Sequence, residues 1–200
     1  MKHPLEMIPT DYRKRLFFTF LLLTLSLFAV FRVLDQPLRT PAAPNGIVSF
    51  ELAGSPLQAQ AITDEWKRSS LLLSAVAGQA DPNIVNIPYA FAAFGLGIDY
   101  LFMPVYAFAL AFGTLLAAGR HRGWLKSLGA VAGYGAFVAA VFDAVENYAL
   151  FQILLNRIVS PYPEIAFYCA SLKFGLLIFG LLYALVGGLL PKTSKRSVGA

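Results

Sequence analysis

Residues that bind metals or carry redox chemistry are scarce in this sequence, which has two histidines, His3 and His121, and a single cysteine, Cys169. One cysteine cannot form a disulfide within the chain, and iron–sulfur clusters need several cysteine ligands. No glycine-rich phosphate-binding motif precedes a lysine, and no serine is accompanied by a nearby histidine base. These features argue against iron–sulfur centres, P-loop nucleotide binding and a serine-based catalytic triad.

Charged residues are also few, at 14% of the chain, whereas about 25% is usual in soluble domains. Hydrophobic residues make up 58% and concentrate in four runs, at residues 16–34, 96–118, 128–155 and 165–190. Each run is close to or above the roughly 20 residues that a helix needs to cross a bilayer. None shows the alternation of a membrane β-barrel strand. The sequence therefore predicts an all-α membrane protein, a bundle of four transmembrane helices that forms one integral membrane domain over residues 1–200.

Lysine and arginine are distributed unevenly between the two sides of this bundle. Ten fall before the first run, between the second and third runs, or after the fourth. Five belong to the other side, one near the end of the first run (Arg32) and four in the other two connections. The positive-inside rule then predicts a multi-pass protein of the plasma (inner) membrane with both termini in the cytoplasm. No small-residue cleavage site follows the first run, so we interpret it as an uncleaved anchor. Topology thus accounts for the net charge of +5, and we expect no nucleic-acid partner.

Residues 35–95 form the longest connection, which this topology places outside the cytoplasm. Residues 47–52 favour a β-strand, and Glu51 within them is expected to be a solvated loop acid rather than a residue that folds over a site. Residues 57–76 fit a short amphipathic helix that caps the bundle or lies on the membrane surface, and we favour the cap. Residues 84–95 either extend the second span or form a separate interfacial piece. The apolar face of the amphipathic helix is expected to contain Leu57, Ala61, Ile62, Trp66, Leu73 and Val76.

Four ionisable side chains, Asp99, Asp143, Glu146 and Lys173, lie inside the apolar runs. Charges at such depth are costly in a bilayer, so their presence requires an explanation. Helices that alternate in direction and rise about 1.5 Å per residue bring all four to overlapping depths in the outer half of the membrane. Three acids against one lysine leave an excess of negative charge, which predicts a protonated carboxyl, a bound cation or water in the same place.

Helical spacing predicts which of these side chains face other helices. Asp143, Glu146 and Asn147 are spaced i, i+3, i+4, and they continue a stripe of alanines at positions 132, 136 and 139. Lys173 shares its face with alanines at 166, 170 and 184 and glycines at 180 and 187. Small residues mark helix contacts in membranes, so both polar faces are expected to point away from lipid.

On the second run, Asp99 and Tyr106 are seven residues apart and share a face, with Pro104 expected to kink the helix between them. We assign no catalytic residue. Because both histidines are expected on the cytoplasmic side, we expect no histidine- or cysteine-ligated metal or haem at the buried charges. The candidate ligand- or ion-binding residues are Asp99, Tyr106, Asp143, Glu146, Asn147 and Lys173.

Three functions remain open on this evidence. The first is a pocket in the outer leaflet, formed by the carboxylates and the lysine, that binds a proton, a cation or a small polar ligand. The second is an integral membrane enzyme that uses Asp143 or Glu146 as general acid or base on a lipid-like substrate. The third is a structural subunit, whose partners besides the lipid bilayer are other membrane subunits or a second copy. A scaffold salt bridge to Lys173 needs only one carboxylate, so the surplus acids favour the first.

Overall fold

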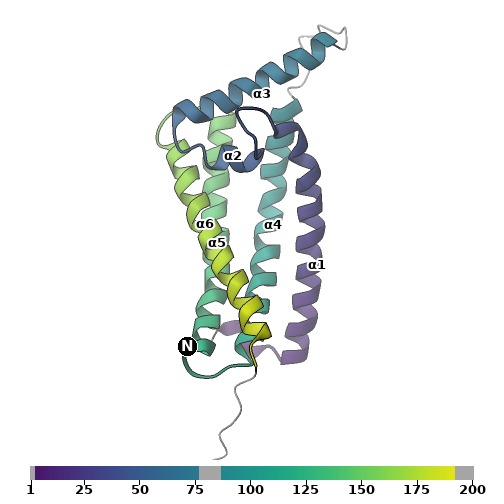
Figure 1. Cartoon of the computed structure of the whole chain (residues 1–200), viewed down its shortest axis with the longest axis vertical. Coiled ribbons are helices and arrows are strands. Elements are labelled where there is room, and N and C mark those ends of the chain that lie inside the picture. Colours follow the sequence, from purple (N-terminus) through teal and green to yellow (C-terminus); the bar gives the residue numbers. More distant parts are fainter. Residues whose placement is uncertain (1–2, 77–86, 192–200) are drawn as a thin grey trace, which may run out of the picture. The chain divides into compact units, whose positions relative to one another are not determined.

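The computed structural model describes residues 3–76 and 87–191, and in these ranges it contains helices and no β-strand. The all-α prediction is confirmed. The helices, labelled in Figure 1, are η1 (Pro4–Met7), α1 (Thr10–Leu34), η2 (Gln36–Leu38), α2 (Ile47–Glu51), α3 (Pro56–Val76), α4 (Ile87–Ala118), α5 (Gly123–Leu154) and α6 (Tyr162–Leu189).

Four of these helices, α1, α4, α5 and α6, are long and apolar enough to cross a membrane, as predicted. All four begin earlier than the apolar runs, α1 at Thr10, α4 at Ile87, α5 at Gly123 and α6 at Tyr162, because a helix can continue beyond its most hydrophobic part. Helix α4 begins at Ile87, so residues 87–95 extend the second span, whereas residues 84–86 lie outside the described residues. Pro88 fits there because the first turn of a helix leaves its N–H groups unbonded.

The contacts within the chain divide it into two compact units, and each of the four long helices contributes to both. Unit 1 contains residues 1–24, 104–140 and 173–200, and unit 2 contains residues 25–103 and 141–172. Each unit has a core of its own.

Unit 1 is packed through small residues. Its core cluster contains three alanines, at positions 117, 118 and 132, around the buried ring of Tyr183. The Tyr183 hydroxyl donates a 2.7 Å hydrogen bond to the carbonyl of Leu125. A side chain at Gly129 would collide with that hydroxyl, and one at Gly180 would collide with Leu110. The predicted use of small residues for close helix contact therefore holds in this unit.

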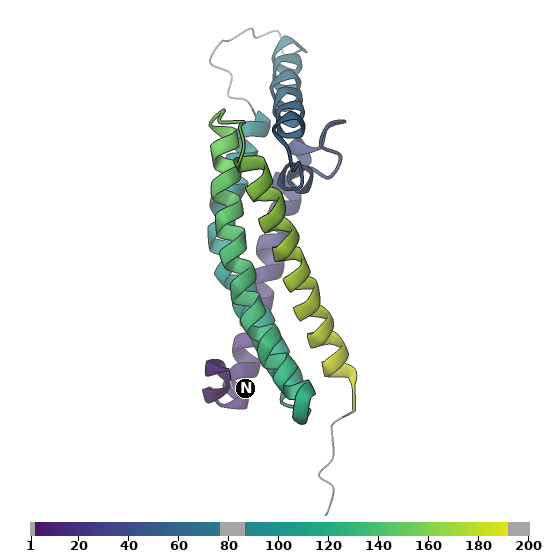
Figure 2. The same cartoon turned by 90° about the vertical axis from the view of Figure 1, so that its left-hand side faces the viewer.

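Unit 2 is built around Trp66 of α3, which is fully buried. Its ring lies 5.0 Å from that of Phe50 and 6.2 Å from that of Tyr89, between ring centroids. In both cartoon views, α3 begins close to α2 and to the ends of α5 and α6 that belong to this unit (Figures 1 and 2). At one of those ends, Lys67 donates a 3.4 Å hydrogen bond to Asn156. Helix α3 thus holds the connecting segment against the core of unit 2.

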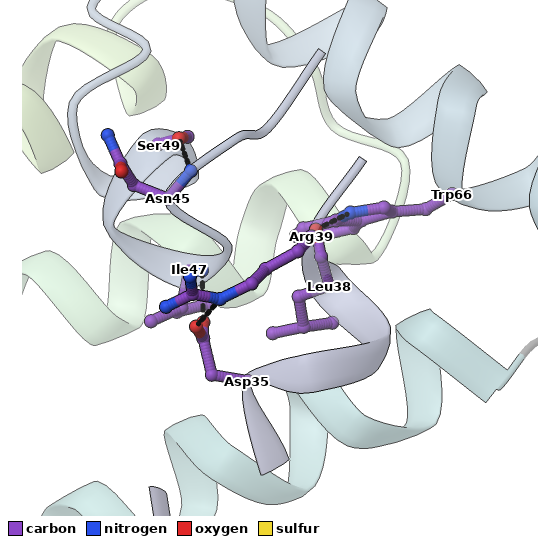
Figure 3. A network of polar contacts seen from close by, with 7 residues as sticks. All are labelled: Asp35, Leu38, Arg39, Asn45, Ile47, Ser49 and Trp66. Carbon is purple, nitrogen blue, oxygen red and sulfur yellow. Dashed lines mark hydrogen bonds and ion pairs between the residues drawn. The ribbon is translucent and has the colours of Figure 1, made fainter. Parts of the chain in front are cut away.

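The segment between α1 and α3 is held by polar contacts (Figure 3). One carboxylate oxygen of Asp35 accepts a 2.8 Å hydrogen bond from the backbone N–H of Ile47, and the other lies 2.9 Å from Nε of Arg39. The indole N–H of Trp66 donates to the carbonyl of Leu38 at 2.9 Å. Gly46 precedes α2 with φ of +59°, and a side chain there would overlap the Asp35 carboxylate.

These contacts explain why the β-strand predicted for residues 47–52 is wrong. The structure has helix α2 at Ile47–Glu51, and Asp35 satisfies an N–H of its first turn. The partner lies 12 residues earlier in the chain, so local β-propensity was overridden by a distant side chain.

The helix predicted at residues 57–76 is present as α3, but part of its predicted apolar face is wrong. Ile62 and Trp66 are buried as expected, together with Ala59 and Thr63. Leu57, in contrast, is 82% exposed, and Ala61 is also exposed. The buried stripe therefore follows the spacing 59, 62, 63, 66. Side chains of Leu73 and Val76 lie outside the described residues.

Candidate functional site

Helix α5 carries a continuous buried stripe that ends in polar residues. The alanines at 132, 136 and 139 are buried, and the stripe continues through Asp143, at 2% exposure, to Glu146 and Asn147, both fully buried. The opposite side of the helix exposes valines at 138, 141 and 145 together with Tyr148. The prediction that the acidic cluster of α5 faces the protein interior is confirmed by this division.

Asn147 joins this cluster to α4 within unit 2. Its amide nitrogen donates one hydrogen bond to the carbonyl of Leu96, at 3.2 Å, and another to a carboxylate oxygen of Asp99, at 2.9 Å. Both partners are acceptors, so the amide must direct its nitrogen toward α4. The sequence predicted only an overlapping depth for Asp99, and the structure brings it into contact with α5 at Asn147. Asp99 itself is half-buried.

The orientation of the Asn147 amide fixes the position of its oxygen. Oδ1 is buried and receives no hydrogen bond from the residues that the structure describes. An amide oxygen has two lone pairs, and leaving it unsatisfied away from water costs about 1–3 kcal/mol. The site therefore presents a buried acceptor next to Glu146, the preceding residue.

Lys173 is also buried, at 5% exposure, on the face of α6 that carries the buried residues Ala166, Ala170 and Gly180. The predicted small-residue stripe around this lysine is thus present. Its ammonium nitrogen lies 4.8 Å from the centre of the Phe174 ring. Lys173 belongs to unit 1, as does Tyr106, which is buried, whereas Asp99, Asp143, Glu146 and Asn147 belong to unit 2.

Sequence reasoning missed one acid of unit 2. Glu51, at the end of α2, is only 8% exposed, so the expectation of a solvated loop acid is wrong. Its neighbour Phe50 is buried against Trp66, which draws the end of α2 into the core of unit 2. The run Phe50-Glu51-Leu52 contained a signal for this burial, since an aromatic residue beside the acid favours an interior position.

Three acids of unit 2, Glu51, Asp143 and Glu146, are therefore buried; we refer to them as the buried acids. In the described ranges, no set of three or more histidine, cysteine, aspartate and glutamate side chains is arranged to hold a metal ion. His3 and His121 lie in unit 1. Comparison with protein-family models, curated proteins and solved structures gave no match for the chain.

Proposed function

We propose that this is an integral membrane protein that binds a proton, or a small cationic or polar ligand with a hydrogen-bond donor, at a buried site on α5. The site consists of the buried acids together with Asn147 and Asp99, all of which belong to unit 2. The observation that carries the proposal is the Asn147 amide, whose oxygen is fully buried with no donor from the described residues while its nitrogen is fully engaged.

The Asn147 side-chain oxygen needs a hydrogen-bond donor, and this need distinguishes the site from a simple salt bridge. Ionised carboxylates only accept hydrogen bonds, so the buried acids in that form offer the Asn147 oxygen nothing. A protonated carboxyl, an ammonium group, a hydroxyl or a bound water each supplies a donor. A proton or an ammonium ligand therefore satisfies the amide and reduces the negative charge in one step, whereas a neutral donor satisfies the amide alone.

The number of buried charges supports the same proposal. With Glu51 added to Asp143 and Glu146, three buried acids stand against the one buried lysine among the described residues. Uncompensated charge in a poorly solvated place costs several kcal/mol per ion, as an order of magnitude. The surplus acids require protons or a cation, whereas a scaffold ion pair requires only one of them.

We further propose that the site lies in the outer half of a plasma (inner) membrane and that both termini are cytoplasmic. The uneven distribution of lysine and arginine along the sequence supports this orientation. Accessibility of single cysteines to a membrane-impermeant thiol reagent tests it directly. A Cys169→Ala background with a cysteine at Leu57 should react from outside, and one with a cysteine at Lys14 should not. The reverse pattern contradicts the orientation.

Infrared spectroscopy on the full chain in lipid nanodiscs tests the proton site. A protonated carboxyl has a C=O stretching band that is distinct from that of a carboxylate, and the band is followed between about pH 4 and pH 9. We expect a persistent band from a protonated carboxyl, which Glu146→Gln should remove or shift.

Asp64→Asn is the matched control, because Asp64 is an exposed acid on α3. This variant should leave the persistent band unchanged. If no band persists in the unmodified protein, the ligand form of the proposal is tested by adding methylammonium, a cation with N–H donors, at neutral pH. Lack of any spectral change at the α5 carboxyls in that experiment as well contradicts the proposed function.

A further inference from the structure

A second polar site lies in unit 1, at the ends of three long helices. A cavity of about 420 Å3 is lined by His3, Glu6 and Met7 from the segment before α1, Arg13 in the first turn of α1, Leu115 and Gly119 at the end of α4, and Lys126 in the first turn of α5. The level at which membrane-crossing helices begin and end is the level of lipid headgroups. The cavity is separate from the buried acids, which belong to unit 2.

His3 supplies a buried hydrogen-bond donor to this cavity. Its ring is only 3% exposed and packs against Tyr134, with ring centroids 4.2 Å apart. Nδ1 accepts a 3.2 Å hydrogen bond from the backbone N–H of Leu5, so the neutral ring carries its proton on Nε2. Nε2 is buried and has no hydrogen-bond partner within residues 3–76 and 87–191.

Arg13 supplies a second donor of the same kind. One terminal nitrogen of its guanidinium donates to the hydroxyl of Thr10 at 3.0 Å. Its Nε is buried and has no acceptor among the residues described. Two buried N–H groups, on His3 and Arg13, thus line one cavity and lack acceptors among the described residues. An anion or another strong hydrogen-bond acceptor in the cavity would satisfy both.

The net charge of the residues that line the cavity indicates how much negative charge its ligand carries. Lys126 lies 4.0 Å from a carboxylate oxygen of Glu6, the outer limit of an ion pair, which leaves ammonium donors available. With Arg13 and Lys126 positive, Glu6 negative and His3 neutral, the lining carries one net positive charge. That balance fits a group with one negative charge, such as a phosphodiester, better than a dianion.

We propose that this cavity binds the phosphate group of an anionic ligand through His3, Arg13 and Lys126. A phospholipid headgroup and free phosphate share this chemistry, and the position at the helix ends favours the lipid. Basic pockets between membrane helices are known to hold anionic headgroups. The bond from His3 Nε2 adds a geometric requirement that a diffuse basic surface lacks.

Native mass spectrometry on the delipidated full chain in an uncharged detergent tests the proposal. Phosphatidylglycerol and diacylglycerol are added separately, because they differ only in the phosphoglycerol headgroup. We expect retention of phosphatidylglycerol alone, about tenfold weaker in Arg13→Gln and in Lys126→Gln, as the loss of one charge-assisted bond predicts. Arg15→Gln is the matched control, since Arg15 is an exposed arginine two residues further along α1.

The outcomes separate the two sources of phosphate. If inorganic phosphate does not displace the lipid, the ligand is a headgroup; if phosphate binds alone and displaces it, the ligand is free phosphate. Equal retention of the two lipids, without phosphate binding, overturns the proposal. So does an equal weakening by Arg13→Gln and Arg15→Gln, which indicates general surface attraction. A His3→Phe variant that still folds should also weaken retention, because phenylalanine keeps a ring beside Tyr134 but has no N–H to donate.

Discussion

Replacing Asn147 with leucine is the sharpest perturbation of the α5 site. The substitution keeps a side chain of similar size in a fully buried position and removes every polar atom from it. Two hydrogen bonds to α4 are lost, one to the carbonyl of Leu96 and one to the carboxylate of Asp99. The unsatisfied Asn147 oxygen is lost at the same time.

The expected loss of stability follows from these three changes. Hydrogen bonds between membrane helices contribute about 0.6 kcal/mol on average and up to about 1.7 kcal/mol. The bond to the Asp99 carboxylate belongs at the upper end, because bonds to charged groups are the stronger ones. We therefore expect Asn147→Leu to lower the free energy of unfolding by about 2 kcal/mol. Removing the Asn147 oxygen offsets part of this loss of stability only if no bound proton, water or ligand donates a hydrogen bond to that oxygen in the functioning protein.

Reversible unfolding in mixed micelles, followed by circular dichroism, measures this loss. Gln152→Leu is the control, since it removes another buried amide from α5 but only one hydrogen bond, from Arg157 at 2.8 Å. We expect it to cost about 1 kcal/mol. A loss below about 0.5 kcal/mol for Asn147→Leu, or a gain, refutes the assignment of the Asn147 amide as the link between α4 and α5.

Three further perturbations test other parts of the structure. Gly46→Ala should cost about 3 kcal/mol, because it combines an unfavourable backbone conformation with displacement of the Asp35 carboxylate from α2. Gly129→Ala should cost about 1–3 kcal/mol by overpacking against Tyr183. Burial lowers the pKa of His3 from its usual value of 6.5, so folding favours the neutral ring. Stability should therefore be complete above about pH 6.5 and fall as the solution is acidified below it.

Each of these has its own control. Gly97→Ala is matched to both glycine variants, since a side chain at Gly97 meets no neighbour within 4 Å. If Gly46→Ala, Gly129→Ala and Gly97→Ala all unfold at the same temperature, close packing at Gly46 and Gly129 does not cause the loss of stability. For His3, the unfolding midpoint is compared between about pH 7.5 and pH 5.5 in the unmodified protein and in His3→Gln. An identical pH slope in the two proteins rules out His3 as the titrating group.

The four long apolar helices and the polar face of α5 were predictable from sequence for a simple physical reason. The length of each apolar run indicates a helix long enough to cross a membrane, and the spacing of Asp143, Glu146 and Asn147 continues that of the alanines before them. Both signals are local, so no knowledge of the rest of the fold was needed. The contact of Asn147 with Asp99 was not predicted, because helical spacing and depth do not say which side chains of two helices meet.

The connecting segment was harder to predict, because distant partners determine it. Residues 47–51 have β-favouring side chains, yet they form α2 because Asp35 accepts a hydrogen bond from the N–H of Ile47. The burial of Glu51 depends on the same helix and on the packing of Phe50 against Trp66. On α3, several apolar stripes were compatible with helical spacing, and tertiary packing selected the one that leaves Leu57 exposed.

The position of Trp66 has an optical consequence. The chain has two tryptophans, one in each unit: Trp66 is fully buried, and Trp124, at the start of α5, is 72% exposed. Replacing Trp124 with phenylalanine leaves a single fluorophore whose indole N–H is bonded to the Leu38 carbonyl. Its emission wavelength and its resistance to aqueous quenchers then report when α3 separates from the rest of unit 2. The reciprocal Trp66→Phe variant reports the environment at the start of α5, so intrinsic light emission follows each unit without an added label.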